Sequence, residues 1–142
     1  MKVSANFHLE EFIDPDTFDA FGEQSIWFID PRIVALAQFM RERLAKPCTI
    51  NNWSFGGKFK HSGFRPPKCT VGATLSQHRF GRAIDLKVKG MTADEVREEI
   101  IGNFDIYKKA GLTTIEDGAY APSWCHIDIR DTKLDILKIV KP

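Results

Sequence analysis

Two short segments in which apolar and polar residues alternate constrain the fold of this chain more than any other feature. In AIDLKV, residues 83–88, aliphatic side chains occupy every second position, and Asp85 falls between two of them. In WCHIDIR, residues 124–130, apolar residues again alternate with polar ones, among them His126 and Asp128. A period of two is typical of strands that bury one face. We therefore expect two half-buried strands with ionisable side chains on the face away from the core.

Helical signals surround these strands. The spacing of apolar residues predicts a helix over 31–45, with Asp30 as its cap and proline at its first position. The capping box TADE at 92–95 predicts a second helix that reaches about Ile101 and resumes to Ala110. Further short elements are expected at 7–12 (a helix or hook), 48–53 and 113–117 (strands), with a long loop over 54–76. The pattern indicates an α+β fold, in which helices pack on a small antiparallel sheet.

The composition excludes several classes of protein. With 142 residues, of which 43% are hydrophobic and 27% charged, the chain is typical of one soluble globular domain spanning 1–142. The formal net charge of +1 gives no electrostatic reason to expect a nucleic acid or an anionic membrane as partner. No apolar run has the length of a membrane helix or the form of a signal peptide. We expect a monomer that is synthesised in a cytoplasm and is exported, if at all, by another route.

Three of the polar residues have the chemistry of a metal site. His78 and Asp85 lie in SQHRFGRAIDL, where Gly81 permits a tight bend that lets the two side chains converge. His126 projects from the polar face of the second strand. Two neutral imidazoles and one carboxylate leave a fourth tetrahedral position for water, which is the arrangement of a catalytic zinc site. Either histidine taken alone would be assigned a structural role, whereas the combination favours metal binding.

The same residues resemble the signature of a known family. SQHRFGRAIDL resembles the Ser-x-His-x-x-Gly-x-Ala-x-Asp motif of the zinc D-alanyl-D-alanine peptidases and the related phage endolysin peptidases, a hedgehog-like metallopeptidase group. HSGFRPP at 61–67 is similar to the upstream Ser-Gly-aromatic-Arg segment of this family, and WCHIDIR is similar to its closing Trp-x-His-x-Asp segment. The matched positions of the central motif are Ser76, His78, Gly81, Ala83 and Asp85. All three motifs occur in the family's order, which implies the family's fold.

The resemblance assigns roles to individual residues. It implies that His78, Asp85 and His126 bind a zinc ion. It also implies that Arg65 holds the substrate, a role that suits a planar group able to donate to a carboxylate or a polarised carbonyl. Ser76 is expected either to hydrogen-bond the substrate or to cap the loop.

The general base is where the chain departs from the family's pattern. Several relatives carry a glutamate where this chain has Ser123, and others carry a histidine where it has Trp124. Alternation turns Glu116 away from the core, and a hairpin would bring it beside His126, where its carboxylate could take a proton from the attacking water. Asp128 is the rival, although it could equally orient an imidazole.

The resemblance implies a zinc peptidase that cuts next to a D-amino acid in the stem peptide of bacterial peptidoglycan. The reaction would be that of a D-alanyl-D-alanine carboxypeptidase or of an L-alanyl-D-glutamate endopeptidase. A phage lysis enzyme released by a holin, a virion-associated enzyme and a cytoplasmic recycling enzyme are all compatible with it. Two alternatives remain: a non-catalytic module that uses the zinc pocket to bind wall peptide or a protein partner, and another metal-dependent hydrolase with the same ligands.

Overall fold

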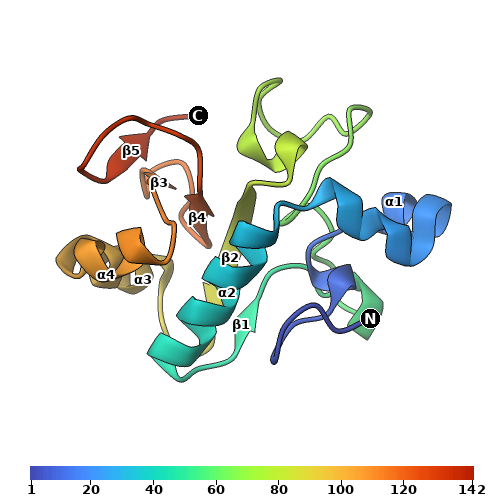
Figure 1. Ribbon diagram of the computed structural model, residues 1–142, viewed down its shortest axis with the longest axis horizontal. Helices are drawn as coiled ribbons and strands as arrows, with labels where there is room; N and C mark the ends of the chain where they lie inside the picture. The colour runs from blue at the N-terminus through green and yellow to red at the C-terminus, as the bar shows by residue number, and fades with distance from the viewer.

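The computed structural model describes residues 1–142, and four α-helices pack in it around a five-stranded sheet (Figure 1). The strands are β1 (Cys48–Thr49), β2 (Ala83–Val88), β3 (Thr114–Glu116), β4 (Cys125–Asp128) and β5 (Lys138–Val140). The helices are α1 (Pro15–Phe21), α2 (Pro31–Leu44), α3 (Ala93–Gly102) and α4 (Phe104–Lys109). Four short 3-10 helices complete the list: η1 (Leu9–Glu11), η2 (Gly22–Phe28), η3 (Trp53–Phe55) and η4 (Gln77–Phe80). The α+β class expected from the sequence is confirmed.

The sheet is mixed rather than wholly antiparallel. Its strand order is β1-β2-β4-β3-β5, and the first four strands pair antiparallel. β5 pairs parallel with β3, so the prediction of an antiparallel sheet is wrong at this edge. β5 has only three residues, two of them exposed, and therefore carries no apolar alternation that could reveal it.

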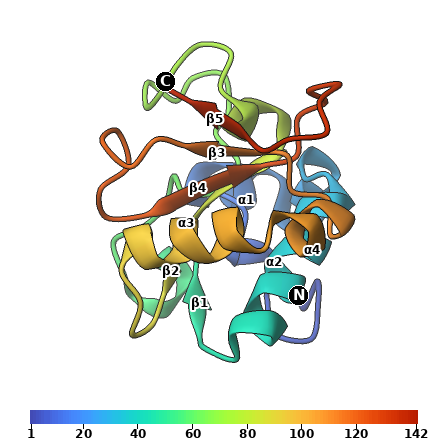
Figure 2. The same cartoon turned by 90° about the vertical axis from the view of Figure 1, so that its left-hand side faces the viewer.

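Helices cover the apolar face of the sheet. The buried residues Ile33, Leu36 and Met40 of α2 belong to the same core cluster as Ile84 and Leu86 of β2. Figure 1 shows α2 crossing β2, and Figure 2 shows α3 lying along β4. Each aliphatic side chain buried in this way contributes about 1.5–3 kcal/mol to folding. The helices thereby fix which face of β2 and β4 is left for the ionisable residues.

The local signals for the longer helices are confirmed. The side chain of Asp30 accepts a hydrogen bond from the N–H of Arg32 at the start of α2. Thr92 and Glu95 form the reciprocal capping box of α3, and α4 follows after a break at Asn103. None of the helices combines the length and apolarity needed to cross a membrane.

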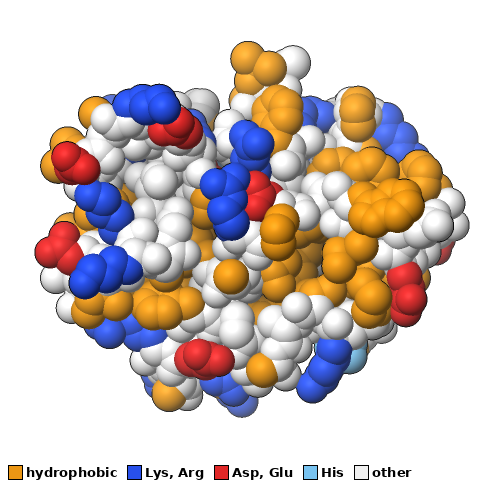
Figure 3. Space-filling view, viewed as in Figure 1, with side chains coloured by type: hydrophobic (Ala, Val, Ile, Leu, Met, Phe, Trp, Pro, Cys, Tyr) orange, Lys and Arg blue, Asp and Glu red, His pale blue; other side chains and the backbone are white.

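The helix α1 and the 3-10 helix η2 were not expected from the sequence. Asp14 caps α1 and Pro15 opens it, which is the same signal that begins α2. Seven residues are too few for a helical period to stand out. Large apolar side chains remain exposed here, with Phe21 at 51% and Trp27 at 78% exposure. Figure 3 shows hydrophobic side chains gathered on the side of the molecule that carries α1.

The predicted loop over 54–76 covers the polar face of β2. The backbone N–H of Asp85 donates to the carbonyl of Ser62 at 2.8 Å, and the N–H of Arg65 donates to the carbonyl of His78 at 3.1 Å. Asp85 is consequently only 6% exposed. The prediction that β2 is half-buried is therefore wrong, because the loop buries the face that the helices do not reach.

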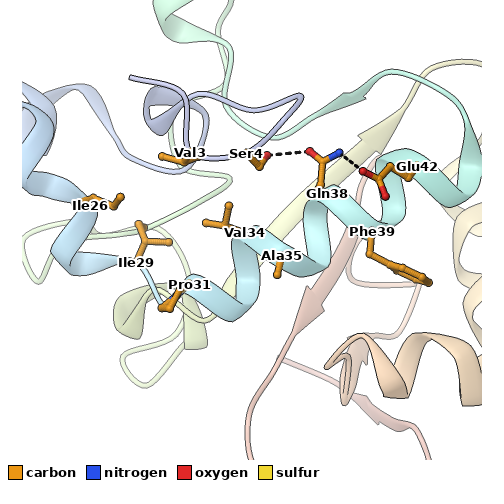
Figure 4. Close-up of a pocket in the computed structure, with 10 residues that line it drawn as sticks. All are labelled: Val3, Ser4, Ile26, Ile29, Pro31, Val34, Ala35, Gln38, Phe39 and Glu42. Carbon is orange, nitrogen blue, oxygen red and sulfur yellow. Dashed lines mark hydrogen bonds between the residues drawn. The ribbon is translucent and has the colours of Figure 1, made fainter.

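A groove of about 450 Å³ lies between the N-terminal segment and α2 (Figure 4). Val3 and Ile29 contribute to its apolar lining. Its polar members form a hydrogen-bonded chain in which Gln38 accepts from Ser4 at 2.9 Å and donates to Glu42 at 2.7 Å. With a single acid and no other ionisable side chain in its lining, this groove has no group of residues suited to catalysis or metal binding.

Gly81 is the residue at which the path from η4 into β2 is most sensitive to substitution. Its φ is +64°, and an added Cβ would overlap the carbonyl oxygen of Phe28. We expect Gly81→Ala to lower the free energy of unfolding by roughly 2–4 kcal/mol, through left-handed strain and a backbone clash. Gly102→Ala is the matched control, since nothing lies within 4 Å of its added Cβ. Denaturant unfolding of both variants measures this, and an equal effect at the two positions would contradict it.

Candidate metal centre

Sheet register places three ionisable residues in one row. Asp85 of β2 lies directly opposite His126 of β4. On the other side of β4, Ile115 of β3 pairs with Ile127, so the next residue, Glu116, falls beside His126. The Glu116 Oε1 lies 3.6 Å from the His126 Nδ1. Because side chains alternate between faces, all three of these side chains point to the same side of the sheet.

His78 reaches this row from η4. Ser76 caps the short helix, its Oγ accepting from the backbone N–H of His78 at 3.4 Å, and Gly81 ends it in the left-handed conformation. The Nδ1 of His78 donates to the carbonyl oxygen of Gly63 at 2.7 Å. This hydrogen bond leaves Nε2 of the ring as the nitrogen that faces Asp85.

Three donor atoms converge at the centre of the site. The distances are 3.1 Å from His78 Nε2 to Asp85 Oδ1, 3.1 Å from His126 Nδ1 to Asp85 Oδ1, and 3.2 Å between the two nitrogens. A tetrahedral cation with bonds of about 2.0 Å would separate its ligand atoms by about 3.3 Å. The spacing therefore fits a metal ion, and His78, Asp85 and His126 could hold one.

Each candidate ligand is oriented by a partner on its other side. The carbonyl of Gly63 holds His78, and Asp128 Oδ2 accepts from His126 Nε2 at 3.0 Å. Arg65 Nη2 donates to Asp85 Oδ2 at 2.9 Å. Such partners fix the tautomer and the ring orientation of a metal ligand. All three donor atoms are thus pre-oriented toward one point.

The electrostatics of the cluster favour a cation at that point. Burial alone would raise the pKa of Asp85, but the neighbouring His78 and His126 outweigh it and hold that pKa far below its usual range. Burial lowers the pKa of His78, which favours the neutral imidazole. Burial also opposes the charging of His126, but hydrogen bonds to Asp128 and Asp85 prevail and raise its pKa to about 9. These shifts indicate that the space between the three side chains favours positive charge, which a metal ion would supply.

The two carboxylates beside His126 have different surroundings. Burial raises the pKa of the half-buried Glu116. Asp128 is completely buried, yet hydrogen bonds from His126 and Arg130 outweigh burial and lower its pKa. Both oxygens of Asp128 accept from Arg130, with Nε at 2.8 Å from Oδ1, so neither is free for another proton. The Glu116 carboxylate makes no hydrogen bond to the protein, and its one close partner is His126, at 3.6 Å.

Arg65 and Ser76 lie at the edges of the cluster. Arg65 is 8% exposed, and besides Asp85 it contacts the carbonyl oxygen of His61, to which its Nε donates at 2.7 Å. Its Nη1 makes no hydrogen bond. Ser76 acts as the cap of η4, one of the two roles expected for it, and it also lines a cleft next to Glu116.

Two clefts lie beside the group formed by His78, Asp85 and His126, and Arg65 lines both. One, of about 320 Å³, contains Glu116 and His126, and its lining also includes residues of the loop before η4 and of the C-terminal segment 140–142. Figures 1 and 2 show the C-terminus beside the loop that precedes η4. The other, of about 300 Å³, contains Asp85 and extends along β2. The two clefts thus reach different members of the cluster, His126 in one and Asp85 in the other.

Sequence reasoning missed two supporting groups. Alternation puts Arg130 on the same strand face as His126 and Asp128, but the sequence alone assigned it no role. The carbonyl of Gly63 had no sequence signal, since any residue offers a carbonyl. The glycine itself is required by packing, because an added Cβ would overlap the backbone of Phe12.

No protein-family model matches the chain, and neither a curated protein nor a solved structure shows significant similarity to it.

We expect the protein to bind one divalent cation, and His126→Ala to abolish that binding. Asp128→Asn should retain the site but weaken its affinity about 10- to 100-fold, because the imidazole loses the anion that orients it. His61→Ala is the matched control, since His61 lies outside the three-residue group. Titration with zinc and with cobalt measures both effects, with circular dichroism to confirm folding. Unchanged affinity in a folded His126→Ala protein would rule out this site.

Proposed function

We propose that this protein is a zinc-dependent peptidase that hydrolyses a bond next to a D-amino acid in the stem peptides of bacterial peptidoglycan. The observation that supports it most is the convergence of His78, Asp85 and His126 at tetrahedral spacing, with Glu116 beside them in an open cleft. Two imidazoles and one carboxylate form the ligand set of zinc hydrolases that keep one position open. The substrate class rests on the three motifs that resemble those of the D-alanyl-D-alanine and endolysin peptidases.

The structure favours Glu116 over Asp128 as the general base. When bound, zinc would lower the pKa of water and polarise the scissile carbonyl. Glu116 would accept a proton from the attacking water and pass it to the leaving amine, since its pKa is raised by burial and its oxygens are free. Asp128 would hold the His126 ring from behind, because its oxygens are already engaged. Arg65 would steady Asp85 and could offer its free Nη1 to the substrate.

The biological setting that we propose is cell-wall degradation. A phage lysis enzyme that a holin releases, or an enzyme carried in a virion, would act on this substrate. Purified peptidoglycan should be digested with the zinc-loaded protein and the products identified by mass spectrometry. Release of D-alanine would identify a carboxypeptidase, and a new glutamyl amine would identify an L-alanyl-D-glutamate endopeptidase. Binding without any new amine terminus would instead support a non-catalytic wall-binding module.

Glu116→Gln should lower turnover by about two to four orders of magnitude while the protein keeps its fold and its zinc. The amide keeps the size of the side chain but cannot take up a proton. Glu98→Gln is the matched control, because Glu98 is exposed and makes no ion pair. Peptide hydrolysis assays on both variants, with metal content measured in parallel, test this. Full turnover in Glu116→Gln, together with loss of turnover in a zinc-loaded Asp128→Asn protein, would make Asp128 the base.

A further inference from the structure

The cleft that extends from Asp85 along β2 is rich in cationic side chains, to which the proposed reaction assigns no role apart from Arg65. It is lined by ten residues, of which four are cationic: Lys58, Lys60, Arg65 and Lys87. Asp85 is the only acid in the lining, and Arg65, His78 and His126 already contact its carboxylate. No ion pair involves any of the three lysines. The cleft therefore carries positive charge that the protein itself does not neutralise.

Lys87 lies on the same face of β2 as the candidate metal ligand Asp85. It follows Asp85 by two residues on β2, so both side chains project from the same face, with Cα atoms about 6.6 Å apart. Trp124 precedes His126 by two residues and lines the same cleft. Lys87 and Trp124, which directly precedes β4, thus both line the cleft next to the row that holds Asp85 and His126.

The Lys87 ammonium is held in place without being neutralised. Its Nζ lies 4.1 Å from the centre of the Phe59 ring and donates to Ser62 Oγ at 3.4 Å. Lys58 approaches the same ring, with its Nζ at 5.8 Å. An aromatic face steadies an ammonium group but removes none of its charge. Lys87 therefore keeps N–H groups for a ligand in the cleft.

We propose that this cleft is a carboxylate-binding subsite, in which Lys87 pairs with a carboxylate of the peptide one or two residues from the bond that is cut. This inference rests on the proposed function, because it assumes that the reacting carbonyl lies at the metal cluster. A peptide residue spans at most about 3.6 Å, so about two residues bridge the distance from Asp85 to Lys87. The volume of about 300 Å³ suits a short peptide segment rather than a nucleic acid strand.

A stem peptide carries two carboxylates that could pair with Lys87: the α-carboxylate of the glutamyl residue and the C-terminal carboxylate. Peptides amidated at one or the other distinguish them. The probes are L-Ala-γ-D-Glu-L-Lys-D-Ala-D-Ala, the same peptide amidated at the glutamyl α-carboxyl, and the same peptide amidated at its C-terminus. Binding is measured by calorimetry on zinc-loaded Glu116→Gln protein, so that the peptide stays intact. We expect one of the two amidations to weaken binding about 10- to 100-fold, the range for a hydrogen bond to a charged group.

Lys87→Met, added to the Glu116→Gln protein, keeps the aliphatic stem and removes the charge. It should reproduce that loss for the unmodified peptide and cause no further loss for the amidated one. Lys109→Met is the matched control and should leave all three affinities unchanged, because Lys109 is an exposed residue of α4 without an ion pair. Zinc content and folding are checked in every variant. The binding of the unmodified peptide should also weaken with added salt.

Equal binding of the three peptides, or a loss in Lys87→Met that is the same for all of them, would overturn the subsite. So would stronger binding of a short single-stranded oligonucleotide that displaces the peptide. The two proposals can fail separately. Carboxylate-dependent binding without hydrolysis by the wild-type protein would contradict the peptidase and leave the subsite intact. Hydrolysis that is indifferent to amidation and to Lys87→Met would contradict the subsite alone.

Discussion

The burial of one carboxylate, that of Asp85, is the constraint on which the rest of the site depends. An ionised carboxylate is costly to remove from water unless cations and hydrogen bonds compensate for the lost solvation. Two imidazoles contact its Oδ1, and the Arg65 guanidinium contacts its Oδ2. The partners are themselves buried, so each in turn requires its own support from Gly63, Asp128 or the backbone. A divalent cation at the centre would place positive charge between Asp85 and the two imidazoles and strengthen the whole arrangement.

This compensation also explains the path of the loop over 54–76. The loop has little apolar periodicity, yet Ser62, Phe64 and Arg65 are all buried. Hydrogen bonds hold it on the sheet: the Asp85 N–H donates to the Ser62 carbonyl, and the His78 ring donates to that of Gly63. Because loop and site share these bonds, metal binding and loop packing should stabilise each other.

The site was more predictable than the fold around it, because the period of a strand is exactly two. That period placed Asp85 and His126 on the polar faces of their strands and turned Glu116 away from the core, and register then set the three side by side. The order of the strands could not be obtained in this way, nor could the parallel strand β5, since both depend on where connections return. The burial of Asp85 was misjudged because alternation reports which face a residue occupies, not what lies over that face.

The positions of Glu116 and Asp128 show how one imidazole can separate two carboxylates into different roles. Both approach His126, one at each ring nitrogen. Asp128 also receives the Arg130 guanidinium, which keeps it ionised and fixed, whereas Glu116 faces a cleft with a raised pKa. When the surroundings raise the pKa of one carboxyl group and lower that of its neighbour, the first is suited to proton transfer and the second to positioning. The carboxylate with free oxygens and the higher pKa is the one suited to carry a proton, because the oxygens of Asp128 already accept four hydrogen bonds from His126 and Arg130.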